Sequence, residues 1–201
     1  MFTAKFSVAA GNTTLKVDIA GDGLVGIVGP NGSGKSRTLR GIAGLVPVGD
    51  CHIVIGGADV TKEYGRDRST VYISQGSYFR ELTVEEHFEL LLKGGPNKKE
   101  EFERIRRAFG IDYSGRMKFR STGQRVRVAV AVAILSGAKL ILLDEVTAVI
   151  SDPESFLESL RTISKESGID FVIATNQANL MGKMNAAYEI ADGTTRAIHM
   201  L

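Results

Sequence analysis

The chain has 201 residues, and its 25 lysines and arginines nearly balance its 23 aspartates and glutamates, which leaves a net charge of +2. This length suits a single domain with a substantial core, and the near-neutral charge predicts neither a nucleic-acid-binding surface nor an acidic tail. The only cysteine, Cys51, excludes an intrachain disulfide and a multi-cysteine zinc site. No apolar run approaches the ~18 residues of a membrane-spanning helix, and the N-terminus lacks the apolar core of a signal peptide. We therefore expect a soluble, cytosolic protein.

Short runs rich in β-branched residues, each bounded by glycine or polar residues, predict a series of strands. These predicted strands are Phe2–Val8, Leu15–Ile19, Leu24–Val28, Cys51–Ile55, Val71–Ser74, Leu140–Leu143 and Phe171–Thr175. Close to the C-terminus, Asp192-Gly193 predicts a hairpin turn.

Helical spacing of apolar residues begins at Thr83 and continues to Phe109, which predicts two helices joined by a loop at Lys93–Lys99. Farther along, Asp152-Pro153 predicts the start of another helix and Gly168 predicts its end. The sequence therefore predicts a mixed α/β core, with a helical stretch from about residue 83 to 135 interposed.

The segment Gly29–Ser36 matches the pattern G-x-x-x-x-G-K-[S/T] in full. Glycines let backbone N–H groups converge on phosphate oxygens, while Lys35 reaches the β- and γ-phosphates and the Ser36 hydroxyl can ligate Mg²⁺. A glycine-rich turn is the alternative, but a predicted strand before the segment and a helical run after it favour a nucleotide site. The residues expected to contact nucleotide are Gly29, Pro30, Asn31, Gly32, Ser33, Gly34, Lys35, Ser36 and Arg37.

Two acidic residues, Asp144 and Glu145, follow the apolar run Leu140–Leu143. At the end of a strand beside a phosphate-binding loop, Asp144 would hold Mg²⁺ and Glu145 would polarise the attacking water. Such a run can also be an ordinary strand end, and its place downstream of the loop favours the catalytic interpretation. The chain contains no N-K-x-D motif, which argues against a GTPase.

Between these two motifs, the segment from Ser121 to Ala129 reads S-T-G-Q-R-V-R-V-A and resembles the L-S-G-G-Q-R-Q-R-V signature of ABC-type ATPases. Gln75 resembles the Q-loop of that family, and Leu82–Glu86 resembles its L-T-V-x-E-N segment. The order and spacing of the motifs match over nearly the whole chain. The signature departs from the family at Arg120, which replaces a leucine, and at Thr122, which replaces the first glycine.

The resemblance implies that residues 1–201 form one nucleotide-binding domain with a P-loop NTPase core, a mixed sheet with helices. An N-terminal antiparallel β subdomain and an inserted α-helical subdomain, about residues 76–135, would complete it. The segment Val126–Ile134 alternates strictly, which is typical of a strand. The resemblance instead implies a helix, which the alanines in the segment and a capping box from Ser121 to Gln124 support.

Residue roles also follow from the resemblance. Gln75 would touch Mg²⁺ or the attacking water, and the residues Ser121, Thr122, Gly123 and Gln124 would face the γ-phosphate bound by a partner domain. Asn176 stands where the family carries a catalytic histidine, so we expect slow ATP hydrolysis. The family's S-A-L-D segment reads Ala148–Ser151 here, or is shifted by one residue to use Asp152. The aromatic residue that stacks on adenine is either Phe6 or absent.

The resemblance thus implies that the chain binds and hydrolyses Mg-ATP, dimerises head-to-tail with an identical or different domain, and powers a separate membrane permease. The surface near Gln75, with Tyr78, Phe79 and Leu82, is the expected docking groove. We expect a cytoplasmic protein, peripheral at the inner face of the membrane through its permease, with no direct nucleic-acid contact. The alternative is a soluble or regulatory ABC protein in which ATP-driven dimerisation acts as a switch with little hydrolysis. One basic cluster could form a nucleic-acid patch, but a surface that is solvated or faces phosphate is favoured. Its members are Arg116, Lys118, Arg120, Arg125 and Arg127.

Overall fold

The computed structural model describes residues 1–11, 13–89 and 96–198. Its strands form one sheet in the order β5-β4-β1-β2-β10-β9-β3-β8-β7-β6. The strands are β1 (Phe2–Ala10), β2 (Thr13–Gly21), β3 (Leu24–Val28), β4 (Gly49–Ile55), β5 (Ala58–Asp59), β6 (Thr70–Ile73), β7 (Leu140–Asp144), β8 (Asp170–Thr175), β9 (Ala186–Ala191) and β10 (Thr194–Ala197). The α-helices are α1 (Lys35–Ile42), α2 (Val84–Glu89), α3 (Pro96–Ala108), α4 (Thr122–Leu135) and α5 (Pro153–Ser167). Short 3₁₀ helices are η1 (Gly65–Asp67), η2 (Met117–Phe119), η3 (Thr147–Val149) and η4 (Ala178–Lys183).

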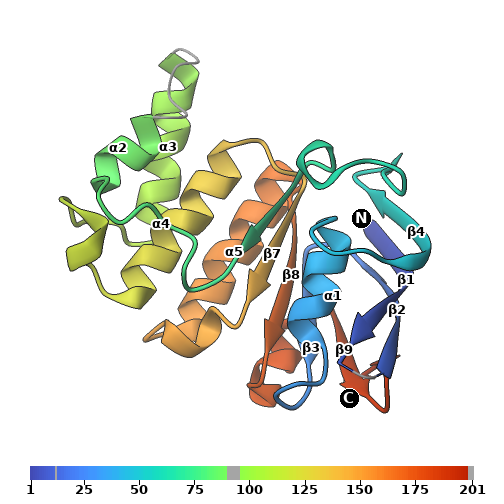
Figure 1. Ribbon diagram of the computed structural model, residues 1–201. Helices are drawn as coiled ribbons and strands as arrows, with labels where there is room; N and C mark the ends of the chain where they lie inside the picture. The colour runs from blue at the N-terminus through green and yellow to red at the C-terminus, as the bar shows by residue number, and fades with distance from the viewer. Residues whose placement is uncertain (12, 90–95, 199–201) are drawn as a thin grey trace.

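The centre of the sheet is parallel. Strand β3 pairs with β8, β8 with β7, and β7 with β6, all in the parallel sense. Helix α1 covers one face of these strands, and α4 and α5 cover the other (Figure 1). Every residue of β7 and β8 is buried, which explains why the strands contain the apolar runs Leu140–Leu143 and Phe171–Ala174 rather than alternating patterns.

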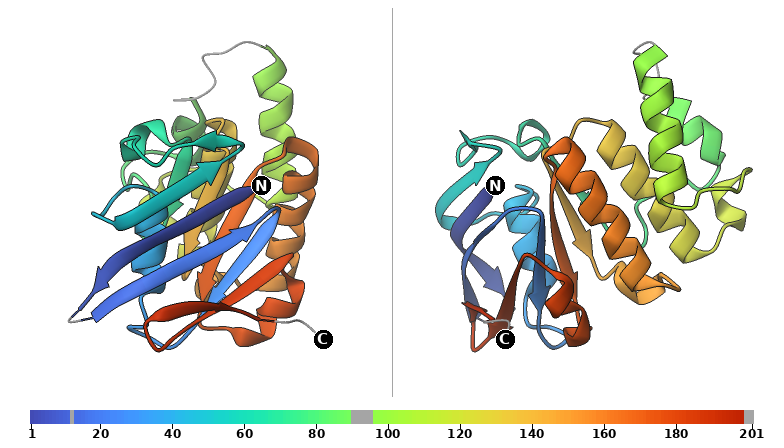
Figure 2. Two further views of the ribbon diagram at one scale, coloured as in Figure 1. Left: turned by 90° about the vertical axis from the view of Figure 1, so that its right-hand side faces the viewer. Right: turned by 180° about the vertical axis from the view of Figure 1, so that it is seen from behind.

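The N-terminal part of the sheet is antiparallel, because β1 pairs with both β2 and β4 in that sense. These strands curl around the opposite side of α1, as the two views of Figure 2 show. Phe6 of β1 is only 3% exposed, and a Cβ on Gly41 of α1 would lie 2.7 Å from its ring. The glycine thus allows the strand and the helix to pack closely.

Helices α2 and α3, with the start of α4, form a helical lobe at one end of the molecule (Figure 1). Helix α4 confirms the helical interpretation of Val126–Ile134 against the alternating pattern. Both hydrogen bonds of the capping box between Ser121 and Gln124 are present. Buried residues lie on several sides of this helix, so its apolar positions need not follow a single amphipathic stripe.

The predicted fold class is confirmed, and so is the hairpin at Asp192-Gly193, where both residues have positive φ, 50° and 71°. The predicted loop Lys93–Lys99 is wrong in its second half, because α3 already begins at Pro96. Proline suits the first turn of a helix, where its missing N–H has no partner to lose. Residues 93–95 lie outside the described residues.

No described helix combines the length and apolarity needed to cross a membrane.

Candidate functional site

The loop between β3 and α1 requires glycine on steric grounds. Gly34 has a φ of 107°, and a Cβ there would lie 2.7 Å from the side chain of Leu15. A Cβ on Gly29 would lie 2.9 Å from the carbonyl oxygen of Ile190. The backbone therefore folds tightly into the N-terminus of α1, whose free N–H groups and positive dipole end favour an anion.

Lys35, the first residue of α1, is buried, with a side-chain exposure of 5%. Its ammonium group donates hydrogen bonds to the carbonyl oxygens of Gly29, at 2.8 Å, and Pro30, at 3.2 Å. It also lies 3.0 Å from Oε1 of Glu145. All three donors of the ammonium group thus have oxygen partners, which offsets the cost of burying its charge.

Asp144 ends β7 and is 7% exposed. The hydroxyl of Ser36 donates a hydrogen bond of 2.9 Å to its Oδ1, and the hydroxyl of Tyr72 donates to its Oδ2. Burial raises the pKa of Tyr72, and the hydrogen bond to Asp144 raises it further. A carboxylate beside a serine hydroxyl is the oxygen-ligand chemistry that Mg²⁺ prefers, so these two residues fit the ion that the sequence implies.

Glu145 has a φ of 53°, an uncommon conformation for a residue other than glycine. Two hydrogen bonds hold its backbone: its N–H donates to Ala174 of β8 at 2.9 Å, and Nε2 of Gln75 donates to its carbonyl oxygen at 3.2 Å. This backbone turn directs the carboxylate toward Lys35. The structure therefore brings Gln75, Asp144 and Glu145 together with Gly29–Ser36, the segment between β3 and α1 that we call the phosphate loop.

A cavity of about 400 Å³ opens beside the phosphate loop. Its lining includes Lys35, Ser36, Glu145, the last residue of β1, Ala10, and the residue after it, Gly11. Phe6, one expected adenine-stacking residue, is buried against α1 and does not line this cavity. That alternative was wrong, because Phe6 lies on the face of β1 that packs into the core.

Asn176 follows β8 at the sheet edge that also bears the phosphate loop, since Thr175 pairs with Val28, the residue before Gly29. Its side chain is exposed. Thr175 is buried, and its hydroxyl lies 2.9 Å from that of Thr147. Asn176 thus directly follows a buried strand end, which the contact between Thr175 and Thr147 links to η3.

The signature segment lies away from the phosphate loop of its own chain, because α4 begins in the helical lobe (Figure 1). Ser121 is exposed at the N-terminus of α4, and a Cβ on Gly123 would lie 2.5 Å from the carbonyl oxygen of Val149. Nearby, Asp152 caps α5 by accepting a hydrogen bond from the N–H of Ser155 at 3.0 Å. The assignment of the S-A-L-D segment, to Ala148–Ser151 or shifted by one residue to use Asp152, stays a prediction.

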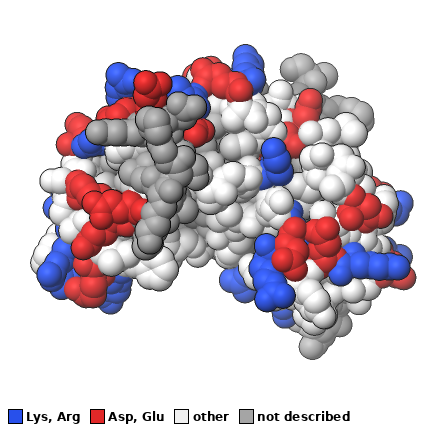
Figure 3. Space-filling view, turned by 90° about the horizontal axis from the view of Figure 1, so that it is seen from above, with Lys and Arg blue, Asp and Glu red and all other residues white. Residues whose placement is uncertain are grey.

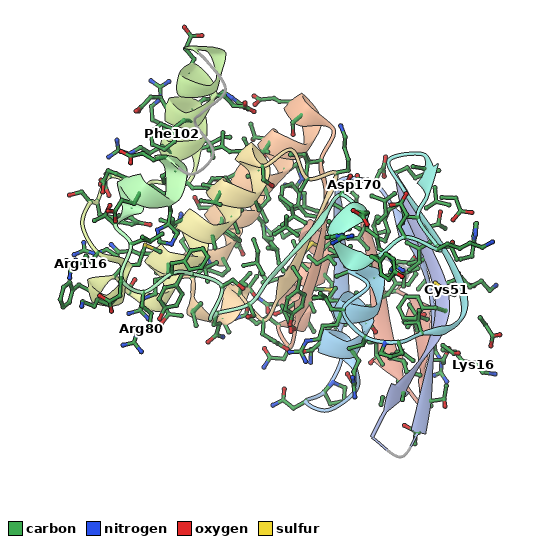
Figure 4. The ribbon with its side chains drawn as sticks, turned by 45° about the horizontal axis from the view of Figure 1, so that its top comes forward. Lys16, Cys51, Arg80, Phe102, Arg116 and Asp170 are labelled. Carbon is green, nitrogen blue, oxygen red and sulfur yellow. The ribbon has the colours of Figure 1, made fainter. Side chains whose placement is uncertain are left out.

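The basic cluster is not one surface. Arg125 donates to the carbonyl oxygens of Met117 and Lys118 and to the hydroxyl of Tyr78, while Arg127 donates to a carbonyl oxygen. Lys118 instead pairs with Glu81 at 2.8 Å, and Arg116 points outward from the helical lobe (Figure 4). Basic and acidic side chains are interspersed on the face in Figure 3.

A second cavity, of about 470 Å³, lies between β6, the segment after it, and α4. Its lining is mainly apolar and includes Tyr78, Phe79 and the buried His87, whose Nε2 accepts a hydrogen bond from the N–H of Phe79 at 3.1 Å. Phe79 is 65% exposed. Leu82, which we expected here, is not among the lining residues.

Sequence reasoning did not identify Tyr72 as part of the site. The sequence offered only a tyrosine hydroxyl in a mostly apolar strand, and only the register of β6 against β7 reveals that this hydroxyl meets Asp144. Tyr72 pairs with Leu142, and Leu142 and Asp144 are two residues apart, so all three side chains lie on one face of the sheet.

This fold and this arrangement of loop, carboxylates and Gln75 define a P-loop nucleotide-binding domain. Residues 13–148 match the profile of the family described as ABC transporter. The chain therefore belongs to the ABC transporter family.

Curated relatives share about a third of their aligned residues with the chain. The molybdenum import ATP-binding protein of Rhodobacter capsulatus is 36% identical over 158 residues, which are 72% of this chain and 43% of that protein. The energy-coupling factor transporter ATP-binding protein of Streptococcus agalactiae is 37% identical over 148 residues, 68% of this chain and 52% of that protein. The chain thus spans about half the length, or less, of these relatives.

Solved structures support the fold. An ATP-binding subunit of an ABC transporter has a TM-score of 0.82 at 20% identity, with 98% of this chain and 90% of that chain covered. An ATP-binding cassette in a dimeric post-hydrolysis state with ADP and Pi has a TM-score of 0.79 at 21% identity, with both chains fully covered, 100% of each.

Proposed function

We propose that the chain binds Mg-ATP, hydrolyses it slowly, and couples the cycle of dimer formation and hydrolysis to a separate membrane permease. The observation that carries this proposal is the meeting of Lys35 and Ser36 with Glu145 and Asp144 at one sheet edge. Lys35 suits a phosphate group, and Ser36 and Asp144 suit a metal ion. Glu145 suits a water molecule. These are the components that phosphoryl transfer to water requires.

In the proposed reaction, the phosphate loop and Lys35 bind the β- and γ-phosphates. Ser36 and Asp144 would hold Mg²⁺, which neutralises charge that develops on the phosphate oxygens. Glu145 orients a water molecule and accepts its proton as the water oxygen bonds to the γ-phosphorus. The bond between that phosphorus and the β–γ bridging oxygen breaks, and ADP leaves with the electron pair. Asn176 can donate a neutral hydrogen bond to the γ-phosphate but cannot carry the proton that a histidine could.

The position of the signature segment, in which Ser121 is exposed and the next three residues are partly exposed, supports a head-to-tail dimer. Helix α4, which Ser121 caps, begins in the helical lobe, away from the loop between β3 and α1 of the same chain (Figure 1). In a two-fold arrangement each signature segment would face the phosphate loop of the partner. Two chains would then complete two sites, and neither chain would complete one alone.

A complementation experiment tests this arrangement. Lys35→Ala leaves the signature intact, and Ser121→Arg leaves the phosphate loop intact, so one complete site forms only when the two variants are mixed. We expect neither variant alone to form dimers with Mg-ATP in light scattering, and the mixture to form them. A mixture that stays monomeric, while the wild-type chain dimerises, would contradict head-to-tail pairing.

The permease is expected to dock in the apolar cavity beside Phe79, and the chain would thereby act at the cytoplasmic face of the membrane. Phe79→Glu places a charge in this cavity and should release the chain from membranes of the source cells. Tyr64→Glu is the matched control, because Tyr64 is 78% exposed and does not line the cavity. Equal membrane association of both variants would favour the soluble, regulatory alternative.

A further inference from the structure

Two hydroxyl groups donate hydrogen bonds to the carboxylate of Asp144, one to each of its oxygens. Ser36 donates to Oδ1 at 2.9 Å, and Tyr72 donates to Oδ2. Asp144 is 7% exposed, so few water molecules reach it, and these hydroxyls provide much of the stabilisation of its charge.

The position of Tyr72 follows from the sheet. Strand β6 runs parallel to β7 with Tyr72 opposite Leu142, which directs the phenol ring along the sheet toward the residue two places farther on, Asp144. The ring is half-buried against the core that includes α1. Its hydroxyl therefore reaches the carboxylate from the side away from the phosphate loop.

Arg40 fixes the tyrosine from a third element. Its Nε donates a hydrogen bond of 3.3 Å to the Tyr72 hydroxyl oxygen, and its guanidinium carbon lies 5.6 Å from the ring centroid. Arg40 and Ser36 are four residues apart on α1, so they share one face of the helix. The helix thus contacts Asp144 directly through Ser36 and indirectly through Arg40 and Tyr72.

We propose that Tyr72 is a positioning residue for the metal site: it holds Oδ2 of Asp144 so that Oδ1 faces Ser36 and the ion that both would bind. The inference rests on the proposed binding of Mg-ATP and adds a residue to it. Groups that orient a metal ligand from behind typically change metal affinity by ~10–100-fold when they are removed. Tyr72 also stands three residues before Gln75, which contacts the backbone of Glu145. One strand and the segment after it therefore reach both acidic residues of the site.

The test compares how wild-type and Tyr72→Phe proteins depend on Mn²⁺, an ion visible by electron paramagnetic resonance, in the presence of a non-hydrolysable ATP analogue. We expect Tyr72→Phe to need a Mn²⁺ concentration about 10-fold higher for half-saturation. Its affinity for the analogue in EDTA should equal that of the wild type, because the phosphate loop is unchanged. Arg40→Met should shift Mn²⁺ binding in the same direction by a smaller factor.

Tyr188→Phe is the matched control, because the Tyr188 hydroxyl also makes two hydrogen bonds from a half-buried ring, to the N–H and carbonyl of Ala20. Unchanged or tighter Mn²⁺ binding by a folded Tyr72→Phe protein would overturn the inference. An equal loss of Mn²⁺ binding and metal-free nucleotide binding would also overturn it, since it would indicate a general structural role. If the wild-type chain itself bound no metal with the nucleotide, the proposed function would fail instead.

Discussion

Nζ of Lys35 and Oε1 of Glu145 lie 3.0 Å apart, so the lysine that would bind phosphate is paired with the carboxylate that would activate water. A phosphate group that binds here must compete with Glu145 for the same charge. Binding of ATP would then release the Glu145 carboxylate from Lys35, so that the carboxylate can accept a hydrogen bond from a water molecule. Substrate binding would thereby make Glu145 available as the general base.

This competition predicts that Glu145→Gln strengthens metal-free binding of ATP. The neutral amide competes less well for Lys35, and hydrogen bonds to charged groups are stronger than those between neutral groups, so we expect an affinity gain of about threefold to tenfold. Titration of a fluorescent ATP analogue in EDTA measures it. Glu63→Gln, at an exposed position, should leave the affinity unchanged, and an equal affinity of all three proteins would argue against the competition.

The second prediction concerns Asn176. If the absent histidine limits the reaction, Asn176→His should raise the rate of phosphate release at saturating Mg-ATP. General acid–base or electrostatic help is typically worth ~10²–10⁴-fold, and we expect a smaller gain because Thr122 also departs from the family signature. A variant no faster than the wild type would exclude Asn176 as the limiting residue.

The third prediction uses the contact between the signature segment and the segment after β7. A methyl group on Gly123 would meet the carbonyl oxygen of Val149 at 2.5 Å, which forces α4 and η3 apart. Gly123→Ala should therefore lower the free energy of unfolding by about 1–3 kcal/mol. Gly182→Ala is the control, since a Cβ there meets no atom within 4 Å. Urea denaturation of both variants decides the matter, and equal midpoints would contradict the prediction.

The fourth prediction concerns Arg68, which is 5% exposed. Its guanidinium donates to the carbonyl oxygens of Gly41 and Ile42, at the end of α1, and its Nε donates to that of Glu63. Arg68→Met would leave these buried acceptors without their donor, at a cost of about 1–3 kcal/mol for each group that stays unsatisfied. We expect a clearly lower thermal midpoint than in Arg66→Met, where the side chain is 85% exposed.

The sequence predicted those parts of the protein that local patterns determine. The phosphate loop needs glycines at fixed spacing, and the buried strands β7 and β8 read as apolar runs because both faces of the sheet are covered. At Val126–Ile134 the local pattern was typical of a strand, and helix α4 was predicted instead from the resemblance to ABC-type ATPases, with the capping box from Ser121 to Gln124 in support.

The sequence could not reveal contacts that depend on tertiary packing. Tyr72 reaches Asp144 only because β6 lies next to β7 in one particular register. The pairing of Lys35 with Glu145 likewise depends on the backbone of Glu145, which adopts a positive φ that no local signal announces. The burial of Phe6 could have been predicted from the sequence, because Phe6 shares one face of β1 with the buried residues Ala4 and Val8.

Phosphate release from the wild-type chain and from Glu145→Gln, at saturating Mg-ATP and under conditions that favour the dimer, tests most directly the claim that this domain hydrolyses ATP through Glu145. We expect measurable but slow turnover by the wild type, below the ~10 s⁻¹ median of enzymes, and a loss of at least about 100-fold in the variant. Equal rates in the two proteins, or no turnover by a wild-type dimer that binds Mg-ATP, would contradict this account.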